Sequence, residues 1–213
     1  MSVVVKICGI TNVADGVAAV DAGADVLGFV FYEASPRFLK IESAAEIIRQ
    51  LPPFTVKTGV FVDAPSDLVV HAIGQCGLNL LQFHGSESPQ YCAQFGLMSM
   101  KAFRIRDEAS LDLLKQYPTE AWLLDSYAPG RVGGTGETFN WDLARRAQGF
   151  GKPIFLAGGL TAVNVGEAIE HVRPYGVDVS SGVEAAPGKK DHEKLRSFIA
   201  AAKKAGRFEQ HGG

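Results

Sequence analysis

The clearest signal of the fold is the segment Val3-Val4-Val5-Lys6-Ile7-Cys8-Gly9-Ile10-Thr11. Its β-branched and apolar residues predict a buried strand, and the residues after Gly9 lead into a helical pattern that Asn12 would cap. Cys8 stands at the end of the strand, where parallel α/β folds keep their reactive side chains. The segment therefore predicts a strand-turn-helix unit with a thiol at the carboxyl end of its strand.

The same kind of apolar run recurs along the whole chain. Runs such as Leu27–Phe31 and Ala121–Leu124 are apolar without alternation, which is typical of a parallel sheet covered on both faces. The predicted strands are Val3–Cys8, Val26–Phe31, Val56–Val62, Asn79–His84, Ser99–Arg104, Ala121–Asp125, Pro153–Ala157 and Val177–Ser180.

Helical patterns fill the intervals between these strands. Most begin at a capping residue or end at glycine or proline. The predicted helices run from Asn12 to Gly23 and over Ile41–Leu51, Ser66–Cys76, Pro89–Phe95, Asp107–Tyr117, Trp141–Ala147, Ala162–His171 and Asp191–Ala205.

Eight strands alternating with eight helices predict an α/β protein, a closed (βα)8 TIM barrel in a compact single domain. The domain would span residues 1–207, and residues 208–213 would be a frayed tail. An open doubly wound sheet is the alternative. It is less favoured because Cys8-Gly9-Ile10-Thr11 is not the GxGxxG turn of dinucleotide-binding sheets.

The amino-acid composition limits the kinds of molecule that the protein can bind. The chain has 213 residues, is 46% apolar and carries a net charge of −2. Charges of both signs are mixed, so no basic surface for nucleic acid or anionic lipid is expected, and the partner should be a small molecule. No leader and no long apolar run is recognised, and three cysteines without CxxC spacing favour a reducing cytoplasm over disulfides or thiolate zinc.

Strand ends would converge at one mouth of the barrel. Small-residue loops follow the last three strands, at Gly133–Gly136, Gly158-Gly159 and Ser180-Ser181-Gly182. Their backbone N–H groups could hold a phosphate. Asp125 is either a capping residue or a general acid whose pKa a partly apolar mouth would raise. Cys8 is either an inert core thiol or a base.

Seven ordered motifs resemble the phosphoribosylanthranilate isomerase family of tryptophan biosynthesis. Phe83 and Asn140 depart mildly from the family pattern, where leucine and aspartate are usual. The motifs are Lys6–Thr11, Ser35–Arg37, Gln82–Gly85, Leu123–Ser126, Gly133–Gly136 with Phe139–Trp141, Leu156–Leu160 and Asp178–Glu184.

The resemblance implies a cofactor-free and metal-free Amadori rearrangement that turns an aminoaldose into an aminoketose. Asp125 would protonate the furanose oxygen, and the Cys8 thiolate would remove the C2 proton. Arg37 would bind the anthranilate carboxylate through its fork of donors. The other expected substrate-binding residues are His84, as a secondary candidate, with Gly134, Gly158, Gly159, Asp178, Ser180, Ser181 and Gly182.

Lys6 precedes Cys8 by two residues, so both side chains should point into the barrel. A buried ammonium needs a partner, and Asp178 on the last strand is the expected one. We expect the positive end of this pair to favour the Cys8 thiolate, because an ordinary thiol with a pKa of about 8.5 is a poor base near pH 7.

Two other functions are less favoured by the sequence. A metal-dependent pentose-phosphate epimerase would need several strand-end ligands, and of the five histidines only His84 falls at such a position. A non-catalytic phosphosugar-binding barrel would be expected to lose either Cys8 or Asp125. No glycine-rich loop follows the second to fourth strands, which predicts that the two-phosphate aminoaldose of histidine biosynthesis is rejected. The protein could be a monomer or a homodimer.

Overall fold

The computed structural model describes residues 2–125 and 141–207. Every predicted strand is confirmed, with each end within one residue of its expected position. The strands are β1 (Val4–Cys8), β2 (Val26–Val30), β3 (Val56–Phe61), β4 (Leu80–Phe83), β5 (Ser99–Arg104), β6 (Ala121–Asp125), β7 (Ile154–Ala157) and β8 (Gly176–Val179).

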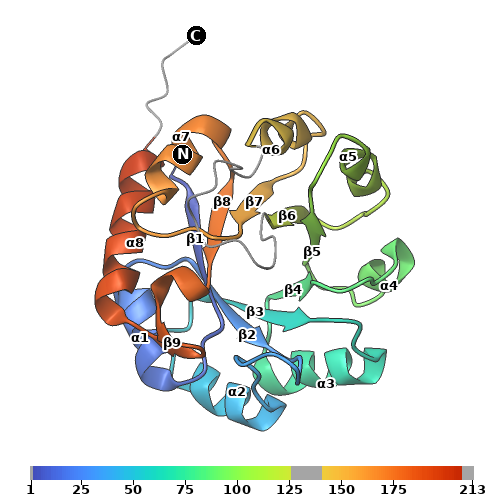
Figure 1. Cartoon of the computed structure of the whole chain (residues 1–213). Helices are drawn as coiled ribbons and strands as arrows, with labels where there is room; N and C mark the ends of the chain where they lie inside the picture. Colours follow the sequence, from blue (N-terminus) through green and yellow to red (C-terminus); the bar gives the residue numbers. More distant parts are fainter. Residues whose placement is uncertain (1, 126–140, 208–213) are drawn as a thin grey trace.

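A helix follows each strand, as predicted. Figure 1 shows the helices arranged around the outside of the strands. They are α1 (Val13–Asp21), α2 (Ile41–Arg49), α3 (Ser66–Cys76), α4 (Pro89–Ala93), α5 (Ala109–Leu114), α6 (Trp141–Gln148), α7 (Val165–Val172) and α8 (His192–Ala205).

Two helices, α5 and α7, begin later than predicted, after turns that polar side chains stabilise. The Asp107 carboxylate accepts hydrogen bonds from the backbone and hydroxyl of Ser110, so α5 begins only at Ala109. Similarly, Asn164 accepts from the N–H of Thr161, in the turn that precedes α7. Asn12 caps α1 as predicted, accepting from the Asp15 N–H at 2.8 Å.

The strands form a closed parallel barrel in chain order, and β8 pairs with β1. This confirms the predicted closed (βα)8 barrel over the open sheet. Lys6 lies in register with Asp178 at the closing pair, and Cys8 lies in register with Gly28 on β2. The strands β1 and β8, which close the barrel, therefore pair two residues before Cys8.

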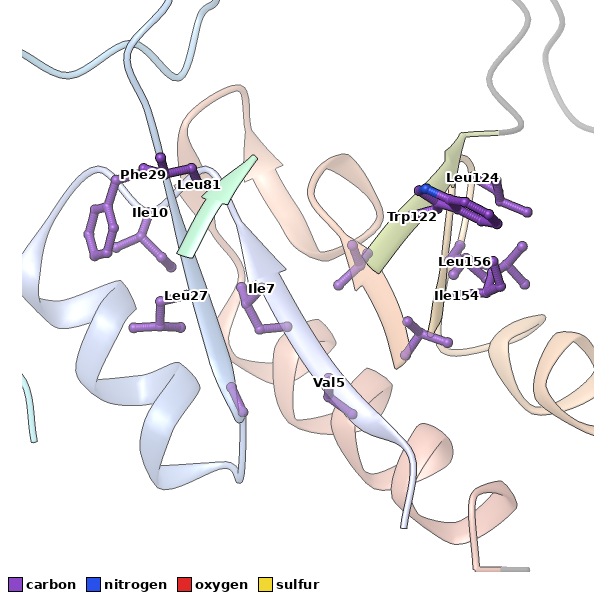
Figure 2. Close-up of a cluster of buried hydrophobic side chains, with 14 of the residues drawn as sticks. Val5, Ile7, Ile10, Leu27, Phe29, Leu81, Trp122, Leu124, Ile154 and Leu156 are labelled. Atoms are coloured by element: carbon purple, nitrogen blue, oxygen red, sulfur yellow. The ribbon is translucent and has the colours of Figure 1, made fainter. Parts of the chain in front are cut away.

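Two cores lie on opposite sides of the strands. Outward-facing residues such as Val5, Ile7, Leu27 and Phe29 are fully buried against the helices, and Figure 2 shows them in one cluster. Inward-facing apolar residues form smaller clusters inside the barrel. Those inner residues are Met100, Ala102, Ala121, Leu123, Phe155 and Ala157, with Cys8, Val30 and Val60 nearer the mouth.

Part of the barrel interior is polar. Lys6 and Thr58 are completely buried, Gln82 is 1% exposed and Asp178 is 8% exposed. Buried polar groups persist in folded proteins only where partners satisfy them or function requires them. This polar layer lies under the mouth where the predicted site residues meet.

One structural element was not predicted. The link from β8 to α8 contains a short 3₁₀ turn (Ser181–Val183) and a two-stranded hairpin, β9 (Glu184–Ala186) with β10 (Lys189–Lys190). The predicted tail, residues 208–213, and the predicted loop Gly133–Gly136 lie outside the described residues.

None of the described helices has both the length and the apolar character needed to cross a membrane.

Candidate active site

A cavity of about 440 Å³ opens at the carboxyl ends of the strands. Its walls bring together ten of the eleven predicted site residues, and the eleventh, Gly134, lies outside the described residues. The ten are Cys8, Arg37, His84, Asp125, Gly158, Gly159, Asp178, Ser180, Ser181 and Gly182.

A second cavity of about 560 Å³ lies beside β4 and β5. It shares only His84 with the ten residues above, and its walls include Lys101, Arg104 and Tyr117. Although it is larger, it contains neither Cys8 nor Asp125. The chemistry therefore places the candidate active site in the smaller cavity.

Cys8 sits over a buried ion pair. Lys6 Nζ lies 2.7 Å from Asp178 Oδ1, which confirms the pair expected from the two-residue period. A Cβ atom added to Gly28 would lie 2.9 Å from Cys8 Sγ and 3.1 Å from Lys6 Nζ. The thiol and the ammonium therefore flank the same small space, which exists because residue 28 has no side chain.

Lys6 favours the Cys8 thiolate, as expected, but it does not bring the pKa of Cys8 below its ordinary value. Burial raises the pKa of the Cys8 thiol above its ordinary value; the positive charges of Lys6 and Lys190 lower it, and Asp178 raises it further. Burial also opposes charge on Lys6, but the Asp178 carboxylate and Cys8 outweigh it, so the pKa of Lys6 lies above its ordinary value. Lys6 acts in the predicted direction without overcoming desolvation.

Asp125 ends β6 and faces His84, the residue that follows β4. His84 Nε2 lies 3.4 Å from Asp125 Oδ2, and His84 Nδ1 lies 2.9 Å from Gln82 Nε2. The His84 ring therefore lies between the Gln82 amide and the Asp125 carboxylate. His84 thus contacts the proposed acid, a relationship that the sequence did not reveal.

Arg37 reaches the cavity from the loop after β2. Its guanidinium makes a two-point ion pair with Glu184: Nε to Oε1 at 2.8 Å and Nη2 to Oε2 at 2.6 Å. The hydrogen bond with Glu184 raises the pKa of Arg37. The Glu184 carboxylate is in turn buried, with 5% of its side chain exposed. Arg37 is therefore held in one orientation.

Glu184 and Lys190 lie beside the predicted site residues, and the sequence did not indicate either of them. The fully buried Lys190 ammonium donates to the Cys8 carbonyl at 2.6 Å, to the Ser180 carbonyl at 3.2 Å and to Glu184 Oε1 at 3.0 Å. A charged residue in a link between elements is ordinarily exposed. The available signal was the Pro187-Gly188 turn between them, which is typical of a hairpin.

The loops after β7 and β8 approach each other closely. Gly158 and Gly159 have φ angles of 88° and 64°, which favour glycine. A Cβ atom on Gly182 would lie 1.9 Å from the Leu160 carbonyl oxygen, so no other residue fits there. The Ser180 hydroxyl is buried and has no hydrogen-bond partner among the described residues. These glycines and Ser180 line one wall of the cavity.

Within residues 2–125 and 141–207, no group of three or more histidine, cysteine or acidic residues is placed to hold a metal ion.

Comparisons with known proteins agree along nearly the whole chain. The family model described as N-(5'phosphoribosyl)anthranilate (PRA) isomerase matches residues 5–201. The N-(5'-phosphoribosyl)anthranilate isomerase of Pelobacter propionicus is 57% identical over 199 residues, covering 93% of this chain and 95% of the relative.

Solved structures of the same kind are similar in fold. The phosphoribosyl anthranilate isomerase of Thermotoga maritima has a TM-score of 0.87 and 40% identity, covering 95% of this chain and 99% of that one. Another has a TM-score of 0.84 and 38% identity over the same shares, and was solved in complex with reduced 1-(o-carboxyphenylamino)-1-deoxyribulose 5-phosphate. On this sequence match and this fold, the chain belongs to the N-(5'-phosphoribosyl)anthranilate isomerase family.

Proposed function

We propose that this chain converts N-(5-phosphoribosyl)anthranilate into 1-(2-carboxyphenylamino)-1-deoxy-D-ribulose 5-phosphate, an Amadori rearrangement of tryptophan biosynthesis. One observation carries the proposal: the Cys8 thiol and the Asp125 carboxylate line the same cavity, together with Arg37 and the glycine-rich loops after β7 and β8. Membership of the isomerase family supports it. The cavity contains an acid, a base and separate groups for the two anionic ends of this substrate.

Asp125 is the proposed general acid. Only 16% of its side chain is exposed, and it lies at the end of β6, inside the mouth. It gives a proton to the furanose ring oxygen, and the C1–O bond breaks as the anilino nitrogen forms a C=N bond with C1. The result is an open-chain protonated Schiff base. His84 Nε2, 3.4 Å from Asp125 Oδ2, orients the carboxyl group.

Cys8 as thiolate is the proposed base. It removes the C2 proton, and the electron pair of the C–H bond forms the C1=C2 bond while the iminium nitrogen is neutralised. The resulting enolamine gains a proton at C1 and loses the proton of its C2 hydroxyl, which gives the ketone. Because burial raises the pKa of Cys8, the positive charges of Lys6 and Lys190 are what make the thiolate accessible. Only protons and electron pairs move within one molecule, so no external oxidant is required.

The two anionic ends of the substrate have separate places in this proposal. Arg37 binds the aryl carboxylate with donors fixed by its ion pair with Glu184. Gly158, Gly159 and the segment Ser180–Gly182 bind the phosphate through backbone N–H groups and hydroxyls. Gly134 would join them from the residues that the structure does not describe. A monomer or a homodimer would both satisfy this arrangement.

A fluorescence assay tests the activity directly. Anthranilate is fluorescent, so consumption of phosphoribosylanthranilate is followed continuously with the wild-type protein. The matched control is the double variant Cys8→Ala/Asp125→Ala. We expect rapid consumption by the wild type and the uncatalysed rate with the double variant. If the folded wild-type protein does not exceed the uncatalysed rate, the proposed function is wrong.

A further inference from the structure

Glu184 forms ion pairs with two cations, Arg37 and Lys190, which lie in different parts of the site. Its Oε1 atom lies 2.8 Å from Arg37 Nε and 3.0 Å from Lys190 Nζ, and its Oε2 atom lies 2.6 Å from Arg37 Nη2. Oε1 also accepts the Gly188 N–H of its own hairpin at 3.4 Å. One carboxylate therefore contacts both the arginine at the cavity wall and the lysine under Cys8.

Both ends of this bridge are firmly anchored. Lys190 is completely buried and donates to the Cys8 and Ser180 carbonyls, and its backbone N–H donates to Asp15 Oδ2 at 2.8 Å. The hairpin turn packs on the Arg37 loop, since a Cβ atom on Gly188 would lie 3.0 Å from the Pro36 carbonyl oxygen. The hairpin thus fixes the position of the Glu184 carboxylate with respect to both β1 and the loop after β2.

The Glu184 carboxylate is buried, and its two cationic partners offset the unfavourable desolvation. Burial opposes its negative charge, but the hydrogen bond from Arg37 and the charge of Lys190 outweigh burial, so the pKa of Glu184 lies below its ordinary value. The carboxylate is therefore ionised at neutral pH. An ionised two-point acceptor holds a guanidinium in a plane much better than a single contact does.

We propose that Glu184 is a positioning residue that holds Arg37 in the orientation needed to bind the substrate's aryl carboxylate, and through Lys190 ties that orientation to the main chain of Cys8. The inference rests on the proposed function, because it assumes a substrate with an aryl carboxylate. Arg37 contacts the substrate, whereas Glu184 acts through Arg37.

Glutamine at position 184 is the sharpest test of this role. It keeps the size of the side chain, but its amide offers one acceptor oxygen and two donors. An N–H group then faces one of the Arg37 donors, and the two-point pair becomes a single contact. Glu184→Asp keeps the negative charge but places it one methylene farther from Arg37. The matched control is Glu193→Gln, which removes the same charge at an exposed position on α8.

The experiment compares two substrates that differ only in the carboxylate. These are phosphoribosylanthranilate and the glycosylamine formed from aniline and ribose 5-phosphate. With the first substrate, we expect Glu184→Gln to lower kcat/KM by about 10- to 100-fold, mainly through KM, because a charge-assisted contact is misaligned. With the second, the variant and wild type should agree within about threefold, because no carboxylate is there for Arg37 to bind. In an Arg37→Ala background, Glu184→Gln should have no further effect.

The results distinguish the proposed function from the positioning role of Glu184. Turnover of phosphoribosylanthranilate by the wild type reports on the proposed function alone. If the wild type is active and Glu184→Gln slows both substrates equally, or slows neither, the positioning role is wrong. If Glu184→Gln does not give a cooperative thermal transition, Glu184→Asp is measured with the same two substrates and should show a smaller loss confined to the first. Failure of both variants to fold would make Glu184 a structural residue and overturn the proposal.

Discussion

Cys8 and Gly28 stand in register on neighbouring strands, and a Cβ atom on Gly28 would lie 2.9 Å from the Cys8 sulfur. Such an approach is closer than carbon and sulfur tolerate, so any side chain at position 28 must displace the thiol or the Lys6 ammonium beside it. The space that Gly28 leaves is therefore part of the site.

Gly28→Ala should reduce both activity and stability. We expect overpacking to cost about 1–3 kcal/mol of unfolding free energy, while a displaced base lowers kcat by about 10²-fold. Gly74→Ala is the control, since a Cβ atom there meets nothing within 4 Å and α3 should gain slightly from alanine. The measurements are steady-state kinetics and urea unfolding. Normal kcat in Gly28→Ala would mean that the sulfur has room to move without consequence.

Asp125→Asn should lower kcat by about 10²- to 10⁴-fold, because an amide keeps the shape of the acid and cannot supply its proton. Asp112→Asn changes the same group on the exposed face of α5 and should retain wild-type activity. Fluorescence assays of both variants decide the matter. Cys8→Ala should show a comparable loss, and full activity in either Cys8→Ala or Asp125→Asn would remove that residue from the mechanism.

Alkylation of Cys8 by iodoacetamide should depend on pH with a midpoint above that of an ordinary thiol, because burial raises the pKa of Cys8. Lys6→Met removes a positive charge that favours the thiolate and should move this midpoint upward. Asp178→Asn removes a negative charge that opposes it and should move the midpoint downward. Peptide mass spectrometry distinguishes Cys8 from Cys76 and Cys92, whose pKa values burial raises to about 11.

If the Cys8 midpoint is the same in wild type and Lys6→Met, the electrostatic role of Lys6 is refuted. Cys8 acts only as thiolate and Asp125 only when protonated, so kcat/KM should pass through a maximum as pH rises.

Lys6→Met should also destabilise the barrel, by about 3–5 kcal/mol at neutral pH, because it leaves the Asp178 carboxylate buried without its counter-ion. The double variant Lys6→Met/Asp178→Leu should recover much of the loss in urea unfolding. The pKa of Lys6 is raised in the folded protein, so its contribution is fully present below the unfolded pKa of about 10.4 and disappears as pH rises through the folded pKa. No recovery in the double variant would show that the pair is not the cause.

The two-phosphate aminoaldose of histidine biosynthesis should not be converted at a measurable rate. Opposite the glycine-rich loops, the cavity wall includes Val30, Tyr32, Val60 and Val62. An apolar wall offers no compensation for desolvating a second phosphate. Competition kinetics with phosphoribosylanthranilate as the reporter substrate test this, and inhibition or turnover at micromolar concentrations would contradict it.

The strands and their order could be predicted because each local signal agreed with the closed parallel barrel. Lys6 and Asp178 could be paired before the structure because strand periodicity fixes which face a side chain points to, and barrel closure fixes which strands are neighbours. The convergence of Cys8 and Asp125 followed from the same rule. Their chemical roles remain predictions, drawn from the family resemblance.

The hairpin contacts could not be predicted because they depend on how a short link folds in three dimensions. Nothing in the sequence spacing of Arg37 and Glu184 indicates that they meet, and Lys190 has no periodic pattern around it. The net pKa of Cys8 was also out of reach, since it depends on how completely the barrel excludes water. Strand periodicity predicts the side of the sheet to which a side chain points. It does not predict how deeply that side chain is buried or how opposing charges balance at it.

The pairing of β1 with β8 means that the site is complete only when residues far apart in the sequence have met. Lys6 meets Asp178 across 172 positions of sequence, and Cys8 meets Lys190 across 182. A nascent chain that has not yet released β8 and the hairpin from the ribosome lacks the Asp178 partner of Lys6 and the Lys190 contact to the Cys8 carbonyl. Contacts so distant in sequence form late in folding. Activity should therefore appear only after Lys190 has been synthesised, and a chain shorter than this should not act on the substrate.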